Sequence, residues 1–237
     1  MDNIKQGCLV CGEELQYQTK ETKKKCFYCN AEVLAAESCI NGHYVCNSCH
    51  SASAFEIITN TCLNITEHDI IKLANTIFKH PSVKMHGPEH HFLVPAVLLA
   101  SYQSDKKKLE SDLEKAKNRA KNILGGFCGY YGTCGAAVGG GIFMSIITGS
   151  TPLSEKEWTL SNLLTSRILK QIADSGGPRC CKRDTYIALI ETANFCSEND
   201  IGIITINSAP SCDFSHLNKQ CKKEECIFFT ETDLNLV

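Results

Sequence analysis

The stretch that decides the fold is CINGHYVCNSC at residues 39–49, where Cys39, His43, Cys46 and Cys49 stand at spacings typical of metal ligands. Two Cys-x-x-Cys pairs precede it. Each such pair can chelate, because two intervening residues let both sulfur atoms face one ion while backbone amides stabilise the thiolates. Together the pairs supply ligands for two tetrahedral sites, namely Cys8, Cys11, Cys26, Cys29, Cys39, His43, Cys46 and Cys49. We predict two structural zinc sites, since about 50 residues bury too little apolar surface to fold unaided.

The spacing leaves the connectivity of these two sites open. A zinc ribbon would join the first two pairs and leave residues 39–49 to close the second site alone, whereas a cross-brace would alternate the pairs. The stretch from Cys26 to Cys49 resembles the first six ligands of a RING finger. It lacks a final Cys-x-x-Cys pair, so Cys8 and Cys11 would have to serve from the other side, and ubiquitin-ligase activity does not follow. We expect His50 to be exposed rather than a ninth ligand.

Length and composition exclude several classes of protein. The chain has 237 residues, 43% of them hydrophobic, with 24 Lys and Arg against 26 Asp and Glu. It is long enough for a real core, its charge is too balanced for a nucleic-acid partner, and no apolar run is long enough to span a membrane. The sequence shows no secretion signal, so we expect its 16 cysteines to be reduced and the protein to be cytoplasmic.

Beyond the cysteine pairs, the pattern predicts a mainly α protein. We place a zinc-binding module at residues 1–52 and an irregular helical, cysteine-rich domain at residues 53–237. Apolar periodicity and capping signals predict helices from the capping box Thr66–Asp69 to His80, after Gly87-Pro88, over residues 104–124 and 154–174, and from Cys180 or Cys181 to about Cys196. Two short runs, Ile201–Ile206 and Cys226–Thr230, predict a C-terminal β element.

Several later cysteines and histidines stand at predicted helix starts, where free amides and the helix dipole favour an anion. Cys180 and Cys181 are flanked by Arg179, Lys182 and Arg183, which favours a lowered thiol pKa. We predict that these two cysteines are cluster ligands or a catalytic nucleophile. The candidate cofactor-binding residues at the three helix starts are Cys128, Cys134, Cys180, Cys181, His86, His90 and His91. The alternative is that the thiols are buried in the core and the glycines beside them serve helix packing; for Cys62 and Cys196 we favour this reading.

A third constellation lies near the C-terminus, where Cys212, Cys221 and Cys226 surround His216 in the sequence. Three cysteines and a fourth ligand can hold zinc or an iron–sulfur cluster, and spacing alone does not separate the two. A zinc staple that anchors the tail is the structural alternative.

Taken together, the motif at residues 41–50, His90-His91, Gly177-Pro178-Arg179-Cys180-Cys181-Lys182 and the late cysteines resemble a cysteine-rich family, domain of unknown function 5714. The resemblance extends over almost the entire chain. It implies an anaerobic prokaryote and an association with SAM-dependent methyltransferase-type domains, but no particular activity.

The leading hypothesis is a metal-binding protein with two structural zinc sites and an iron–sulfur or reactive-thiol site. It would act in redox or sulfur chemistry or assist a partner such as a SAM-dependent methyltransferase or a radical enzyme. The alternative is a non-catalytic, zinc-stabilised adaptor that binds another protein.

Overall fold

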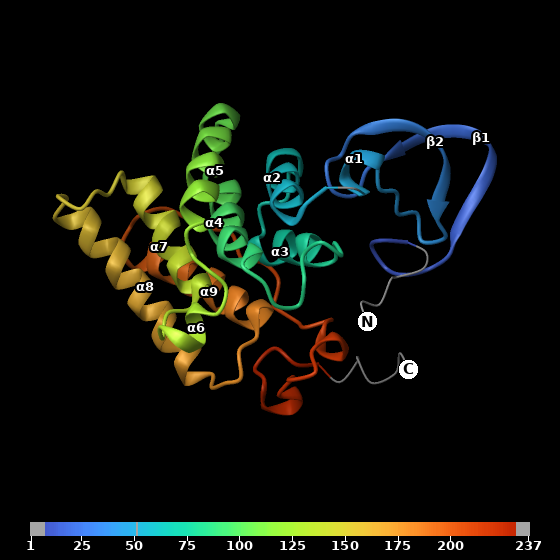
Figure 1. The fold of residues 1–237 in the computed structure, drawn as a ribbon. Coiled ribbons are helices and arrows are strands. Elements are labelled where there is room, and N and C mark those ends of the chain that lie inside the picture. The colour runs from blue at the N-terminus through green and yellow to red at the C-terminus, as the bar shows by residue number, and fades with distance from the viewer. Residues whose placement is uncertain (1–7, 51, 231–237) are drawn as a thin grey trace.

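The computed structural model describes residues 8–50 and 52–230 (Figure 1). Helices make up most of this part of the chain, and its one sheet has two strands and lies in the N-terminal region. The predicted fold class, a mainly α protein behind a small cysteine-rich module, is therefore confirmed. None of the described helices is both long and apolar enough to cross a bilayer.

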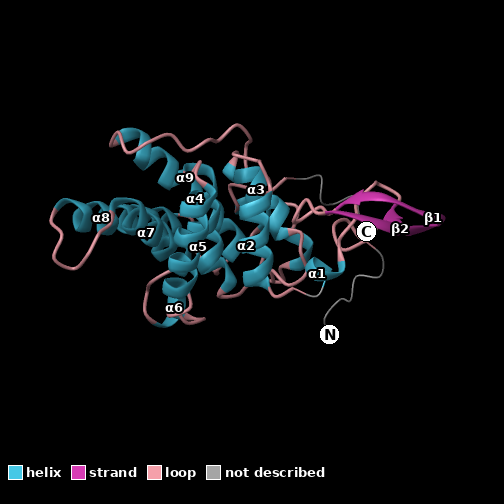
Figure 2. Cartoon of the chain, turned by 90° about the horizontal axis from the view of Figure 1, so that it is seen from above, coloured by secondary structure: helices cyan, strands magenta, loops and turns pink. Residues whose placement is uncertain are grey.

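The N-terminal module is built on a β-hairpin that the sequence analysis did not predict. Strand β1 (Leu15–Lys25) pairs antiparallel with β2 (Glu32–Cys39), with an irregularity in the pairing between Tyr17 and Thr22. Strand β1 is almost wholly exposed, whereas β2 becomes buried toward Cys39, and the hairpin projects away from the helices (Figure 2). A short helix, α1 (Asn47–His50), follows. The apolar cluster of the module is small and consists largely of cysteines and tyrosines, so apolar burial does little to stabilise the module.

The larger part of the chain packs around one central helix, α4 (Glu89–Tyr102). Nearly every side chain of α4 from Glu89 to Ala100 is buried, which is expected of a helix that is apolar on all sides. It contacts five of its neighbours, α2, α3, α5, α7 and α9. The surrounding elements are α2 (Ala54–Asn64), α3 (Ile70–Phe78), α5 (Lys106–Ala120), α6 (Phe127–Tyr130), α7 (Gly135–Thr148), α8 (Lys156–Asp174) and α9 (Cys181–Glu198).

Most predicted helices are present, with shifted ends. Helix α3 begins one residue after Asp69, whose carboxylate accepts the amides of Ile71 and Lys72 and so caps the helix. Helix α5 is shorter than predicted, and it buries a stripe of Leu109, Leu113, Ala116 and Ala120. Helices α2 and α6 were not predicted.

The predicted C-terminal β element is reduced to a single parallel bridge between Cys212 and Phe229. The predicted strand at Ile201–Ile206 is wrong, since the chain there is irregular. The tail is held instead by single buried side chains, including Phe214 and Phe228 in the main core, and by two 3-10 turns, Ser215–Leu217 and Lys223–Glu225. It lies below the helices in the view of Figure 1.

The module and the helices have two apolar clusters, and Ile57 of α2 belongs to the cluster of the module. The Nε2 of His80 lies 3.0 Å from the carbonyl oxygen of Cys49, and the His80 ring packs edge-on against Tyr28 at 4.8 Å between centroids. The side-chain amide of Asn30 donates to the carbonyl of Asn64 at 2.6 Å. The domain boundary at residue 52 stays a prediction.

Candidate metal centres

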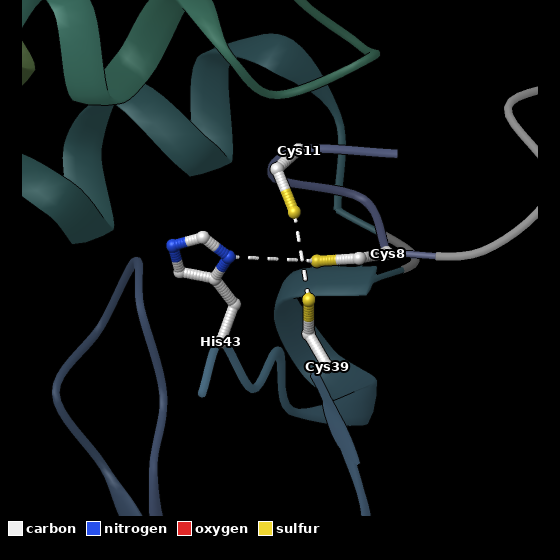
Figure 3. Close-up of side chains that lie close together, drawn as sticks. All are labelled: Cys8, Cys11, Cys39 and His43. Atoms are coloured by element: carbon white, nitrogen blue, oxygen red, sulfur yellow. Dashed lines mark hydrogen bonds between the residues drawn. The ribbon is translucent and has the colours of Figure 1, made fainter. Parts of the chain in front are cut away.

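The first cluster of ligand side chains joins the N-terminal loop to the end of β2. Cys8, Cys11, Cys39 and His43 each direct one ligand atom to a common point, and these atoms lie within 4.8 Å of one another (Figure 3). The Sγ atoms of Cys11 and Cys39 are 3.5 Å apart, and the Sγ of Cys8 is 3.9 Å from the Nδ1 of His43. This arrangement can hold one metal ion.

The second cluster joins the turn between the strands to α1. Cys26, Cys29, Cys46 and Cys49 meet the same distance criterion, and the Sγ atoms of Cys29 and Cys46 are 3.7 Å apart. Three of these four residues are buried. The carbonyl of Cys49 is the group that His80 contacts, so a buried histidine of the helical domain helps to fix the position of this ligand. No spacing or motif in the sequence indicates this role of His80, because it depends on a contact between residues 31 positions apart.

Local backbone geometry explains why these cysteines converge. After each of the first two Cys-x-x-Cys pairs the chain turns back through a residue with positive φ, Gly12 at +84° and Asn30 at +58°. In each turn that residue's amide donates to the carbonyl of the first cysteine, at 2.7 Å to Cys8 and 3.0 Å to Cys26. Glycine and asparagine tolerate this left-handed conformation better than other residues. The turns therefore bring both thiols of a pair to the same side.

The thiols are close enough to affect each other's ionisation. Burial opposes ionisation of Cys11, but the amide of Glu13 and the side chains of Cys39 and His43 outweigh it and lower the pKa of Cys11 to about 6. In the second cluster, burial and the charge of Cys26 raise the pKa of Cys49. Several thiolates in so small a space repel one another. A bound cation would remove this repulsion, which is a property expected of a metal site.

The pairs alternate between the two clusters, so the connectivity is a cross-brace and not a zinc ribbon. Cys8 and Cys11 complete the cluster of Cys39 and His43 from the other side, as the partial resemblance to a RING finger required. His50 is exposed and belongs to neither cluster.

Three helix starts in the larger domain do come close together. The thiol of Cys134, which precedes α7, lies 3.8 Å from the carboxylate of Asp184 in the first turn of α9. The thiol of Cys181 accepts the amide of Gly87 just before α4. Cys128 and Cys134 line one hollow together with Arg179 and Arg183. Whether these residues bind a cofactor stays a prediction.

The expectation of a lowered thiol pKa at the start of α9 is wrong. Burial and the charge of Asp184 raise the pKa of Cys181 to about 11, although the amide of Gly87 opposes this shift. Burial also raises the pKa of Cys180. One of the three cations expected to lower the pKa of these thiols pairs with a carboxylate instead, since the Nε of Arg183 lies 3.1 Å from Asp184 in a buried ion pair.

The three candidate histidines near the start of α4 make internal contacts. The ring nitrogens of His90 lie 3.3 Å from the Thr185 hydroxyl and 3.0 Å from the Lys84 carbonyl, and burial lowers the pKa of His90 to about 3. The Nδ1 of His91 lies 3.0 Å from the carbonyl of Ile123. His86 contacts the side chain of Asn218 through Nε2, and its buried Nδ1 has no hydrogen-bond partner among the described residues.

A cavity beneath the start of α9 is lined by four cysteines, Cys180, Cys212, Cys221 and Cys226; we call it the four-cysteine cavity. The predicted late constellation of Cys212, Cys221 and Cys226 is therefore brought together. Its fourth member is Cys180, which is at least 32 positions away in the sequence, and not His216, which is exposed and does not line the cavity. Only the folded chain reveals this neighbour.

Comparison with known proteins identifies the family of the chain. The chain matches the model of a family of unknown function (DUF5714) over residues 58–229, which is most of its length. No curated protein and no solved structure matches it. The matched region begins after the cross-brace, within α2, and includes the helices from α3 to α9 and all four lining cysteines. The chain therefore belongs to the family of unknown function DUF5714.

Proposed function

We propose that this protein is a metalloprotein in which two structural zinc ions hold the N-terminal module, while the later thiols of the helical domain serve redox or sulfur chemistry. The observation that carries the proposal is the pair of closed, alternating four-ligand clusters in residues 8–50. These clusters can bind metal, and the proposal of zinc and of a structural role builds on that property.

The size of the clusters supports zinc. In a tetrahedral site with Zn–S bonds of about 2.3 Å, neighbouring sulfur atoms lie about 3.8 Å apart. The Sγ–Sγ distances of 3.5 Å and 3.7 Å are close to that value. One cluster has the donor set Cys₃His and the other Cys₄, which are both common structural zinc sets.

A structural role follows from the number of ligands. Catalytic zinc sites usually keep one position for water or substrate, whereas each cluster here offers four protein ligands. The apolar cluster of the module is also small, so the bound ions would supply most of its folding free energy. Zinc would thus fix the position of the hairpin and the loop that contacts His80.

The chemistry of the larger domain would come from its surplus thiols. The two clusters use seven of the 16 cysteines and leave nine for the rest of the chain. Of these, Cys62 and Cys196 are buried in the core, as expected for inert thiols. The other seven are at least partly accessible and line two cavities or lie beside them, which suits an iron–sulfur or reactive-thiol site.

The partner we propose is a SAM-dependent methyltransferase or a radical enzyme of an anaerobe, which a redox protein could supply with electrons. The second candidate function, a non-catalytic adaptor, has one observation in its favour. The module exposes apolar side chains on its hairpin, with Tyr17 at 76% and Leu34 at 63% exposure. Such residues on a rigid zinc-held module suit contact with another protein.

Metal analysis of the full-length protein tests the proposal. Protein purified under strict anaerobiosis is expected to contain two zinc ions per chain, together with iron and acid-labile sulfide or a thiol that reacts rapidly with an alkylating reagent. Two zinc ions with no iron and no reactive thiol would favour the adaptor. Protein that folds with no bound metal would contradict both.

A further inference from the structure

We propose that Cys180, Cys212, Cys221 and Cys226 form a third metal centre, in which four thiolates bind an iron–sulfur cluster or, with closer sulfur atoms, a single zinc ion. This inference deepens the proposed function, since it names the ligands for the metal chemistry assigned there to the later thiols. It does not depend on the two zinc sites of the module.

The first support is the placement of the four side chains. Cys180 stands at the start of α9, and the other three lie on the irregular tail that passes below it (Figure 1). All four line the same cavity and are partly buried. The cavity has mainly apolar walls, which include Met85, Tyr186, Phe228 and Phe229. Four soft donors around an apolar cavity match the ligand set of a thiophilic metal.

The second support is the backbone around the sulfur atoms. In the N-terminal module the amides of Val10 and Asn41 donate to the thiols of Cys8 and Cys39, each from two residues further along the chain, at 3.4 Å and 3.3 Å. The tail repeats this geometry. The amide of Lys223 donates to the thiol of Cys221 at 3.4 Å.

The other cysteines of the cavity show related contacts. The thiol of Cys212 accepts the amide of Phe214, again two residues on, and that of Cys180 accepts the amide of Arg183. Amide donors of this kind stabilise thiolates that ligate a metal. Three of the four lining cysteines therefore accept backbone amide hydrogen bonds, as Cys8 and Cys39 of the module do.

The third support is a buried cation beside the cavity. Lys182 is 1% exposed, and its Nζ lies 4.3 Å and 4.2 Å from the ring centroids of Phe78 and Phe214. Its hydrogen bond to the carbonyl of Phe78 is long, 3.4 Å, and within residues 8–50 and 52–230 it forms no ion pair with a carboxylate.

An anionic centre would account for this lysine. A buried charge is costly unless it is compensated. Four thiolates exceed the charge of one Zn²⁺ by two, and thiolate-ligated iron–sulfur clusters are likewise anionic. The negative charges that would act on Lys182 are those of Cys180 and Cys212, together with that of the Glu89 carboxylate, which forms no ion pair with it. The lysine therefore lies where it would offset the negative charge of the proposed centre.

The four thiols are spread more widely than those of the module, while the cavity they line has a volume of about 20 Å³. In the described part of the chain, the groups of three or more ligands within 4.8 Å are the two in the module, so these four sulfur atoms are spread more widely. A cluster spans several iron atoms, and its cysteines stand further apart than those around one zinc ion. A zinc ion would require the tail to draw closer to α9.

Metal and sulfide analysis of matched variants tests this centre. Wild-type protein, Cys212→Ala, Cys221→Ala and the control Cys196→Ala are purified anaerobically and reconstituted with ferrous iron and sulfide or with zinc. Cys196 is buried on the same helix as Cys180 and lies outside the cavity. We expect the wild type and Cys196→Ala to bind a third centre, and both tail variants to lose at least nine-tenths of it while keeping two zinc ions.

Each outcome has a definite meaning. Iron, sulfide and a visible absorption band that the tail variants lose identify a cluster, and a third zinc ion lost in the same way identifies a single-ion site. Two zinc ions and nothing further in the wild type, or a third centre unchanged in both variants, would overturn the inference. Loss of the module's zinc with the third centre intact would instead count against the structural zinc sites. If a variant fails to fold, the metal and sulfide content of the wild-type protein still shows whether a third centre exists.

Discussion

The module and the four-cysteine cavity gather cysteines in different ways. In the module every ligand has a partner three or four positions away, and tight turns after Cys11 and Cys29 bring each pair together. In the cavity, Cys180 comes from a helix start and its companions from a tail with little regular structure. The difference teaches that local spacing reveals a metal site only when its ligands are paired in sequence.

The largest effect that separates the two regions is expected from metal removal. A strong chelator should unfold residues 8–50, because structural zinc contributes about 10 kcal/mol or more per ion to small modules. The helices around α4 have their own apolar core and should persist. Hydrogen exchange resolved along the chain checks this. Continued protection of β1 and β2 after zinc has left would contradict it.

Acid should destabilise the helical domain because His90 is buried and neutral in the folded protein. Its pKa in the folded protein is about 3, against an ordinary value of 6.5, because the ring is buried. The unfolded chain therefore binds a proton first as the pH falls, and stability is lost progressively below pH 6.5. The loss at pH 4.5 should be roughly 3 kcal/mol.

Comparison with His90→Gln isolates this contribution, since protonation of the zinc ligands is common to both proteins. The free energy of unfolding, measured at pH 7 and pH 4.5, should fall less in the variant. An equal fall in the two proteins would mean that His90 is not the group responsible.

The glycines of α7 test whether its glycine-rich sequence serves packing. A methyl group at Gly140 would lie 2.3 Å from the Cδ1 of Ile168, whereas one at Gly125 would meet nothing within 4 Å. Gly140→Ala should therefore cost about 1–3 kcal/mol by overpacking. Gly125→Ala should be nearly neutral. Thermal unfolding of the two variants gives the comparison, and equal midpoints would refute the packing role.

The smallest effect is expected at His50. Its ring is exposed and outside both clusters, so His50→Ala should keep two zinc ions and change stability by less than about 0.5 kcal/mol. His43→Ala is the matched variant, since His43 is a ligand of the first cluster. Loss of one zinc ion from both variants would show that the boundary of the cluster is misplaced.

The sequence predicted the features that depend on short-range patterns. The eight ligands of the module and the start of α9 both follow from the spacing of residues that are close in the sequence. Helix α2 was not predicted, although Ser53 and Glu56 form a capping box at its start. The hairpin was missed because β1 is rich in lysine and polar residues.

Other features depend on contacts that no local pattern encodes. The alternation of ligand pairs is set by how the hairpin folds back, and both connectivities satisfy the same spacing. The thiol pKa values at the start of α9 were misjudged because burial and Asp184 act against the nearby cations. The predicted tail strands failed for a similar reason, since a strand requires a neighbour that the tail does not provide beyond one bridge.

Zinc counts in two double variants test the cross-brace most directly. Cys8 and Cys39 belong to one cluster, whereas Cys8 and Cys26 belong to different clusters. Cys8→Ala with Cys39→Ala should therefore cost one zinc ion per chain, and Cys8→Ala with Cys26→Ala should cost two. The reverse result, with two ions lost in the first variant and one in the second, would establish a ribbon and contradict the account.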